Sequence, residues 1–374
     1  MKKLFVLAAA MCLLATSAYA AEWNFYGSAR VLTQFSSTET PPANTDVDTL
    51  QHGLAGNARI GANVKASDSL IGRFEYGTGS SGPTGVTNAA VIRLLYGEWN
   101  FGAGKLLVGQ DYTPVFNITG NQIFSPAVGT SDDVNMLMFG TAYSGREGQV
   151  KLKFGNFQIA MLAPGTAYNS TTVNADANAV VVSSLNTEAT VPAFEASYRF
   201  AMDNWWFVAN GGYQTFDVRT GAGTNWLDVD SYILAANAGI TFGPVTLSGT
   251  VNVGQNSGNL ITTRTAGAAG NAGNGKGLAA LQSGIVYDNE TFGLGLVGQF
   301  KANDMFTIEA GYGYAENEYD IAGSQEDDVA TYYIQTTITL APGVMITPEI
   351  GVVDFKQSGQ DEITYIGARW QLNF

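Results

Sequence analysis

Short and long connections alternate along this chain between segments that have the pattern of β-strands. The long connections are rich in Gly, Asn, Ser and Thr, as in residues 37–55, 164–192 and 256–276. Such an alternation is expected when every second turn lies on the same side of a closed sheet that crosses a membrane. Seven very short connections fall near residues 67–68, 102–104, 155–156, 202–204, 243–244, 302–304 and 341–343.

Apolar and polar side chains alternate within the segments between these turns. In the first segment Trp23, Phe25 and Val31 share one parity, and Asn24 and Arg30 share the other. This period of two is typical of a strand with one apolar and one polar face. Soluble β-sandwiches have the same period, but they would place aromatic side chains near mid-strand. Here the aromatic residues gather close to the short turns, as expected for a girdle at a membrane interface.

The number of strands depends on the interpretation of residues 255–290. If segments 278–287 and 292–300 were both strands, the count would be seventeen and the chain ends would lie on opposite sides of the membrane. Bacterial single-chain barrels have even numbers of strands. We therefore assign residues 255–290 to one external loop. The fold predicted is all-β, a 16-stranded antiparallel transmembrane β-barrel with short periplasmic turns and long external loops, which encloses an aqueous channel.

The first 20 residues have the pattern of a secretory signal peptide. Lys2 and Lys3 precede an apolar segment, residues 4–15, and an Ala-x-Ala cleavage site ends at Ala20. The apolar segment is too short to span a bilayer, and the chain has no apolar run of 18 residues. We expect cleavage after Ala20, a mature barrel of residues 21–374, and export to the outer membrane of a Gram-negative bacterium. Cys12 would be lost with the signal peptide, so no disulfide is expected.

The charge balance is strongly acidic. Loss of Lys2 and Lys3 from the 18 basic side chains leaves 16 against 32 acidic ones, a formal charge of −16. Binding to phosphates needs clustered Lys and Arg, so nucleic acid is excluded as an expected partner. A negative surface attracts cations, which predicts a weak preference for cations.

The connection of residues 113–145 is too long and irregular for an ordinary turn. It ends in the apolar patch of residues 134–139, which follows Asp132 and Asp133. Loops of this length without secondary structure are usually functional or disordered. We hypothesise that this loop folds into the lumen and narrows the pore, and that Met136, Leu137, Met138 and Phe139 pack on the inner wall. The alternative is a solvated surface loop.

Several short motifs occur in a fixed order in the first half of the chain. They are residues 25–29 (FYGSA), 57–61 (NARIG), 72–76 (GRFEY), 93–97 (RLLYG) and 108–112 (VGQDY), and the last strand alternates and ends on Phe374. In these motifs the chain resembles the trimeric general porins of Gram-negative outer membranes. The resemblance implies a homotrimer, a third loop folded inward, a terminal Phe that serves outer-membrane assembly, and an arginine cluster facing that loop's acids.

The resemblance also assigns the bases of the constriction. Arg59 and Arg93 fall on the cluster positions of the family. Many members have a lysine where this chain has Ser28, and Arg30, two residues on, would replace it. Arg73 on the third strand is a further candidate.

Arg146, which follows the long loop, matches another cluster arginine, although Gln149 has the lumenal parity that would turn Arg146 outward. Arg93 and Glu98 likewise have opposite parity. A β-bulge at Gly97 would bring both of them inside, because glycine within a strand often marks a bulge. On the loop side, Asp132 and Asp133, together with Asp111, are the candidate acids, and facing bases and acids would bias ion selectivity.

Other motifs carry little weight. Residues 77–82 fit G-x-G-x-x-G, but no helix pattern follows, and residues 270–277 lack the Ser or Thr that ends a P-loop. His52, the only histidine, is expected in the first external loop, so neither a two-histidine metal site nor a catalytic centre is predicted. No cofactor is expected, although acids of the external loops, Asp46, Asp48 and residues 326–328, could hold Ca²⁺ or Mg²⁺ that bridges to lipopolysaccharide.

The function expected is therefore passive diffusion of ions and small hydrophilic solutes through a water-filled channel in a homotrimer surrounded by outer-membrane lipid. Two alternatives stay open. A solute-specific channel for a sugar or an oxyanion would need an aromatic slide or a ladder of bases along the lumen. A barrel hydrolase would need His52 beside a Ser or Asp, and we expect no enzymatic activity.

Overall fold

The computed structural model describes residues 21–374 apart from several gaps. The predicted signal peptide, residues 1–20, lies outside the described part. The other gaps are residues 41–44, 79–89, 118, 125–135, 137–138, 171–181, 184–185, 220–224, 262–276, 322–323, 325 and 357–361.

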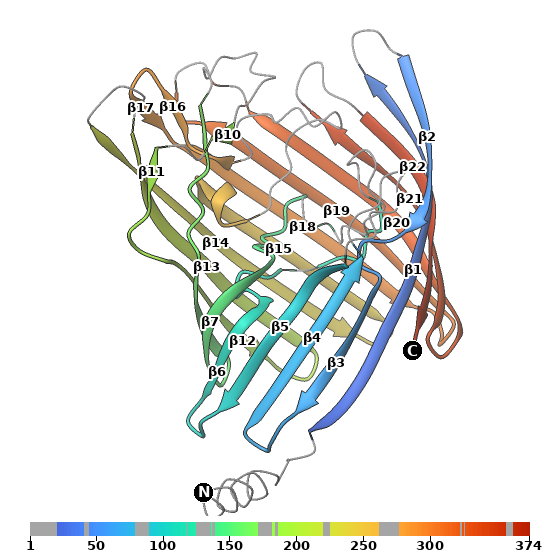
Figure 1. The fold of residues 1–374 in the computed structure, drawn as a ribbon. Coiled ribbons are helices and arrows are strands. Elements are labelled where there is room, and N and C mark those ends of the chain that lie inside the picture. The colour runs from blue at the N-terminus through green and yellow to red at the C-terminus, as the bar shows by residue number, and fades with distance from the viewer. Residues whose placement is uncertain are drawn as a thin grey trace, which may run out of the picture.

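The described strands form a closed antiparallel barrel of sixteen strands, as predicted (Figure 1). Two of the sixteen are interrupted, so the second consists of β2 and β3 and the eighth of β11 and β12. The first eight comprise β1 (Glu22–Thr40), β2 (Thr45–Leu54), β3 (Arg59–Lys65), β4 (Leu70–Thr78), β5 (Ala90–Asn100), β6 (Lys105–Tyr112), β7 (Arg146–Phe154), β8 (Phe157–Leu162), β11 (Thr187–Glu188) and β12 (Ala193–Ala201). The second eight are β13 (Trp205–Arg219), β14 (Trp226–Phe242), β15 (Val245–Gln255), β18 (Asn289–Lys301), β19 (Phe306–Tyr319), β20 (Asp327–Ala341), β21 (Val344–Phe355) and β22 (Glu362–Asn373).

The barrel closes where β1 pairs with β22. Beside this seam the chain's last residue is held by two backbone hydrogen bonds, from the Gly27 amide to the Phe374 carbonyl (2.7 Å) and from the Phe374 amide to the Gly27 carbonyl (3.1 Å). A Cβ on Gly27 would lie only 2.4 Å from the Phe374 ring, so glycine leaves the space that the terminal ring occupies.

All seven predicted short turns join consecutive strands of the barrel. The interpretation of residues 255–290 is also confirmed, since β15 ends at Gln255 and β18 begins at Asn289. The intervening connection contains a 3-10 helix, η1 (Ser257–Asn259), and two short strands, β16 (Ala280–Gln282) and β17 (Ile285–Tyr287). These two strands pair with β9 (Tyr168–Asn169) and β10 (Val182–Ser183) in a separate small sheet.

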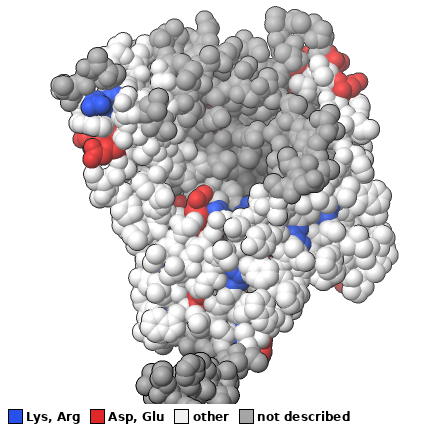
Figure 2. Space-filling view, viewed as in Figure 1, with Lys and Arg blue, Asp and Glu red and all other residues white. Residues whose placement is uncertain are grey.

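Side-chain parity separates an apolar outer face from a polar inner one. On β14, Leu234 and Ile240 are exposed on the outside, whereas Ser231 and Asn237 are buried on the inside. Figure 2 shows that most of the visible outer wall is uncharged, with acidic side chains near the upper rim. An uncharged wall fits contact with lipid, because a charged side chain facing the middle of a bilayer is costly. None of the described helices is long and apolar enough to span a membrane.

The wall is not equally high all round. The strands from β3 to β8 have between 6 and 11 residues, whereas those from β13 to β22 that belong to the barrel have between 11 and 17. The low side adjoins β1 (Figure 1). It also carries the arginine residues described next.

Candidate functional site

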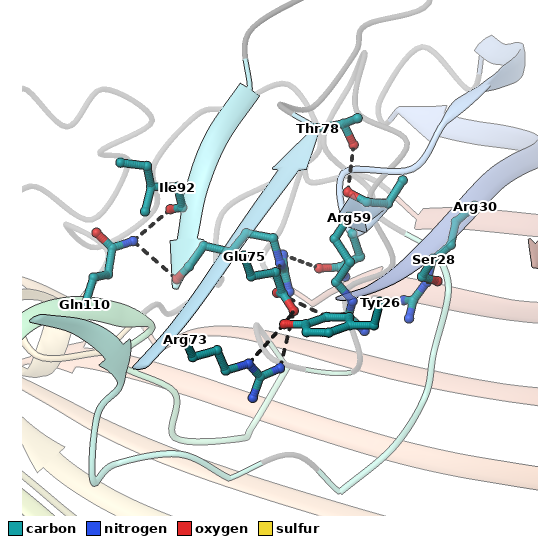
Figure 3. Close-up of polar contacts among 12 residues, drawn as sticks. Tyr26, Ser28, Arg30, Arg59, Arg73, Glu75, Thr78, Ile92 and Gln110 are labelled. Atoms are coloured by element: carbon teal, nitrogen blue, oxygen red, sulfur yellow. Dashed lines mark hydrogen bonds and ion pairs between the residues drawn. The ribbon is translucent and has the colours of Figure 1, made fainter. Parts of the chain in front are cut away.

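A buried glutamate organises the arginine side of the lumen (Figure 3). Arg93 Nε donates a hydrogen bond to Glu75 Oε1 at 2.6 Å, and both side chains are less than 5% exposed. Guanidinium nitrogens of Arg59 and Arg73 lie 3.7 and 3.5 Å from the same carboxylate. The Tyr26 hydroxyl donates to Glu75 Oε2 at 2.9 Å and accepts a bond from Arg73 Nε at 3.0 Å. Four strands, β1, β3, β4 and β5, thus contribute to one charged network.

Arg93 reaches this network through a β-bulge. Glu75 pairs with Leu94, but the next residue of β4, Tyr76, pairs with Ile92, so Arg93 is the extra residue. Two adjacent side chains of a bulge can point to the same face, and both Arg93 and Leu94 are buried on the inside.

The position of this bulge corrects the sequence prediction. Gly97 pairs with Gly72 in unbroken register, so the bulge is at Arg93 and not at Gly97. A second glycine makes room for the arginine, because a Cβ on Gly77 would lie 2.4 Å from Arg93 Cδ. The expectation that Arg93 and Glu98 both face inward is nevertheless fulfilled, since both are buried on the lumenal side.

The less buried arginines line a cavity of about 350 Å³ on the lumenal wall. Arg59 and Arg73 keep 25% and 35% of their side-chain surface exposed, whereas Glu75 keeps 2%. Arg30 donates a hydrogen bond to the Ser28 hydroxyl at 2.9 Å beside them. The described wall therefore presents positive charge to the lumen, because the carboxylate lies beneath the guanidinium groups. The lining residues are Tyr26, Gly27, Ser28, Arg30, Arg59, Arg73, Glu75, Leu94, Tyr112, Gln371, Asn373 and Phe374.

A second row of ion pairs follows on the neighbouring strands. Lys105 and Lys153 lie 2.9 and 2.7 Å from the two carboxylate oxygens of Glu98. Lys151 lies 2.7 Å from Asp111, and both of these side chains are largely buried. Bases again outnumber acids, three to two, among these five residues.

The described parts of the loop of residues 113–145 lie inside the barrel and pack on the far wall (Figure 1). Met136 and Phe139 are fully buried in an apolar cluster with Val297 and Tyr333. The Phe124 ring stacks on Tyr365 with ring centres 3.8 Å apart. The prediction that the apolar end of the loop packs on the inner wall is confirmed for Met136 and Phe139. Leu137 and Met138 lie outside the described residues.

Three buried glutamates hold the loop to this wall. Glu195 accepts the Val115 amide at 2.8 Å, and Glu349 accepts the Ile123 amide at 3.0 Å. Glu309 accepts hydrogen bonds from the backbone and side-chain nitrogens of Asn121 at 2.7 and 2.6 Å. It also accepts bonds from Gln299, Tyr333 and Gln335, at 2.6, 2.6 and 2.8 Å.

Sequence reasoning missed these glutamates. The available signal was their lumenal parity combined with uncharged neighbours, because Glu309 pairs across the strands with Gln299 and Gln335.

The family model described as Gram-negative porin matches residues 7–358 of this chain. The chain belongs to the Gram-negative porin family. Among solved structures this porin is similar to the outer membrane channel DcaP of Acinetobacter baumannii, with 14% identity, a TM-score of 0.71, and 95% of this chain and 97% of that chain covered. A comparison with curated protein sequences finds no match.

Two further solved porins share the fold. The anion-selective porin from Comamonas acidovorans has 12% identity and a TM-score of 0.56, with 94% of this chain and 100% of that chain covered. The trimer form of OmpT from Vibrio cholerae has 16% identity and a TM-score of 0.54, with 94% and 99% covered.

The other candidate constriction residues of this porin are Arg146 and the three acids. The Arg146 guanidinium lies 5.6 Å from the centre of the Tyr112 ring, and that ring lines the arginine cavity. Asp111 pairs with Lys151 on the wall. Asp132 and Asp133 lie outside the described residues.

Two predictions about polar residues need correction. His52 is on β2 rather than in a loop, and its Nδ1 lies 2.9 Å from the Thr33 hydroxyl. Asp327 is 1% exposed at the start of β20, whereas an exposed loop charge was expected. Its neighbour Asp328 accepts a hydrogen bond from Tyr314 at 3.2 Å. Across the described ranges no group of His, Cys, Asp and Glu is arranged to hold a metal ion.

Proposed function

We propose that this porin is a water-filled channel for passive diffusion of ions and small hydrophilic solutes across the outer membrane of a Gram-negative bacterium. The observation that carries the proposal is the inward loop packed on one wall, with a cavity lined by charged side chains on the other wall. Charged and polar groups at close quarters in a pore replace part of a solute's hydration shell, whereas an apolar lining would repel water.

The low wall supports a homotrimer. An outer face made of short strands would be the natural contact between copies, and the OmpT structure that shares the fold is a trimer form. The same proposal includes export directed by residues 1–20 and contact of the higher wall with lipid and lipopolysaccharide. It also includes binding of Ca²⁺ or Mg²⁺ at the exposed rim acids Asp46 and Asp48.

A second candidate is a channel that prefers solutes with an anionic group. The specific observation is the excess of bases on the wall that the loop leaves open, where Arg30, Arg59 and Arg73 line one cavity with Glu75 beneath. The net charge of −16 led to the opposite expectation, a weak preference for cations. Charges on the pore wall act more strongly on a passing ion than distant charges do. Salt screens the interaction between exposed charges beyond a Debye length of about 8 Å.

Solute flux into liposomes separates the two candidates. We expect proteoliposomes containing this porin to swell in a neutral pentose and in a small carboxylate of similar size. Preference for anionic solutes predicts faster entry of the carboxylate and loss of this advantage in Arg59→Ala/Arg73→Ala. Equal swelling rates for both solutes, unchanged in the variant, would refute the preference for anionic solutes and support the general diffusion channel. No swelling in either solute would refute the channel itself.

A further inference from the structure

An apolar patch on the inner wall faces the external half of the lumen. Phe216 and Val218 on β13 and Val229 on β14 have the lumenal parity of Gln214 and Ser231, yet each is at most 2% exposed. Apolar side chains that faced water would be unfavourable, by roughly 25 cal/mol for each Å² of apolar surface. Another part of the chain therefore covers the patch.

The cover is the small sheet of β9, β10, β16 and β17. Tyr168 of β9 and Ala279, which precedes β16, pack against Phe216 and Val229 in one apolar cluster. The two connections that supply the sheet are far apart in the sequence, and they meet where Asn169 pairs with Ala280. Figure 1 shows β16 and β17 at the end of the barrel opposite the short turns.

Hydrogen bonds join this sheet to the wall and its two connections to each other. Gln214 on β13 donates to the Gly165 carbonyl at 2.6 Å and accepts the Gly165 amide at 3.0 Å. Asn259 likewise bonds both backbone groups of Ala167, at 2.8 and 3.0 Å. Asn169 donates to the Tyr319 hydroxyl on β19 at 3.2 Å.

The same insertion touches the inward loop. Leu260 and Ile261, directly after η1, are buried in a cluster that contains Val115 and Ala142. These two residues belong to the beginning and the end of the loop. This second apolar cluster is separate from that of the small sheet, and the hydrogen bonds between Asn259 and Ala167 join the two segments.

We propose that residues 165–169, 257–261 and 278–287 form a vestibule insert, a second inward-folded element that sets the size limit for solutes before they reach the constriction. Together with the inward loop it covers lumenal side chains from β8 through β12 to β22 and on to Leu32 of β1. Solutes therefore pass along the basic wall of β3 to β7 and the first part of β1. This inference rests on the proposed channel function, but it concerns which segment limits solute size and not whether solutes pass.

The variant Gln214→Ala/Asn259→Ala tests the insert. It removes four hydrogen bonds that seat residues 165 and 167, and none of the arginine residues is changed. We expect a higher single-channel conductance and a several-fold rise in the swelling rate with a trisaccharide relative to a monosaccharide. The reversal potential in a KCl gradient should stay unchanged. The matched control is Gln158→Ala/Asn303→Ala, which removes hydrogen bonds toward the short-turn end of the barrel, at Ser197 and within the short turn between β18 and β19.

A cysteine pair tests the same inference if the first variant does not fold. Cys12, the one cysteine of the chain, lies in the predicted signal peptide, so Asn169→Cys/Ala280→Cys introduces the two thiols of the mature protein. If the vestibule insert is always seated, we expect the two thiols to oxidise completely to a disulfide without any change in conductance. Absence of the crosslink, or equal trisaccharide rates in Gln214→Ala/Asn259→Ala and wild type, would overturn the vestibule insert. A wild-type protein that does not conduct would instead refute the channel function.

Discussion

Glu75 holds several like charges close together on the pore wall. Arg93 is its nearest partner and is as deeply buried as Glu75 itself, whereas Arg59 and Arg73 reach the lumen. A buried carboxylate is costly to place without partners, and buried guanidinium groups are equally costly without an acid. Each therefore stabilises the other. The part of the network that remains visible to a passing ion is positive.

Neutralising Glu75 should have two measurable effects. In Glu75→Gln the buried Arg93 loses its countercharge, and removal of one partner of a buried ion pair costs about 3–5 kcal/mol in unfolding free energy. The uncompensated arginines should also shift the reversal potential in a KCl gradient toward anions. Thermal denaturation in detergent and planar-bilayer recordings measure the two effects.

Glu98→Gln is the control for position, because its partners Lys105 and Lys153 are more exposed and it should lose less stability. Equal stability of Glu75→Gln and wild type would contradict the organising role of Glu75.

The sequence predicted the arginine residues of this network better than it predicted their partner Glu75. Arg59 and Arg93 were found through the family resemblance, and the need for a bulge between Arg93 and Glu98, which we predicted at Gly97, followed from their opposite parity. The location of that bulge depends on cross-strand register, which one sequence does not contain. Glu75 was visible only as a polar residue of one strand, and its role requires that β1, β3, β4 and β5 bring four partners together.

The inward loop is the element that we propose narrows the pore. It is held by apolar burial at Met136 and Phe139 and by carboxylates that accept its backbone amides at three separate points. Glycine permits the closest approach. At Gly140, with φ of +86°, a Cβ would lie 2.2 Å from the carbonyl oxygens of Leu294 and Tyr314.

Gly140→Ala should lift the loop from the wall. The added methyl cannot fit against two backbone oxygens, so we expect altered single-channel conductance and increased current noise in an otherwise assembled barrel. Gly102→Ala is the matched control, since Gly102 has a similar φ of +92° but no atom within 4 Å of the added Cβ. The control shares the backbone strain of about 1–2 kcal/mol for this conformation and lacks the clash. Identical recordings from both variants would contradict the proposed seating.

The loop was only partly predictable. Its length and its apolar end indicated an element that packs inside, because an apolar run at the end of a long polar connection needs a surface to cover it. Its anchors were not predictable, since Glu195, Glu309 and Glu349 lie 80, 188 and 226 residues from the amides they accept. The vestibule insert was also missed. Its strands are only two or three residues long, which is too short to give a recognisable pattern in the sequence.

For the whole molecule, the turn positions followed from the sequence because turn lengths and side-chain parity repeat around a barrel. The strand count needed in addition the rule that bacterial single-chain barrels have even numbers of strands. The uneven height of the barrel wall did not follow from the sequence. On the low wall two glycines of the outer face, Gly72 and Gly97, are paired across β4 and β5, and each has room for a Cβ. The barrel itself does not require glycine at these points, and we propose that they permit close approach of another copy.

Gly72→Leu/Gly97→Leu should therefore weaken the trimer without unfolding the barrel. Each added side chain would stand on the outer face in the proposed contact between copies. We expect a shift from trimer to monomer in detergent, measured by light scattering, with unchanged circular dichroism. Ala238→Leu, on the high wall of β14 and also exposed outward, is the control and should remain trimeric. A fully trimeric double variant would place the contact elsewhere.

The most direct test of the channel is single-channel recording of the purified wild-type protein in planar bilayers, with reversal potentials in a KCl gradient. A water-filled pore predicts ohmic steps whose conductance rises with salt concentration. An open basic wall predicts that Arg59→Ala/Arg73→Ala moves the reversal potential toward cations. A conductance too small for hydrated ions, or one blocked by a single solute at low concentration, would contradict the general diffusion channel.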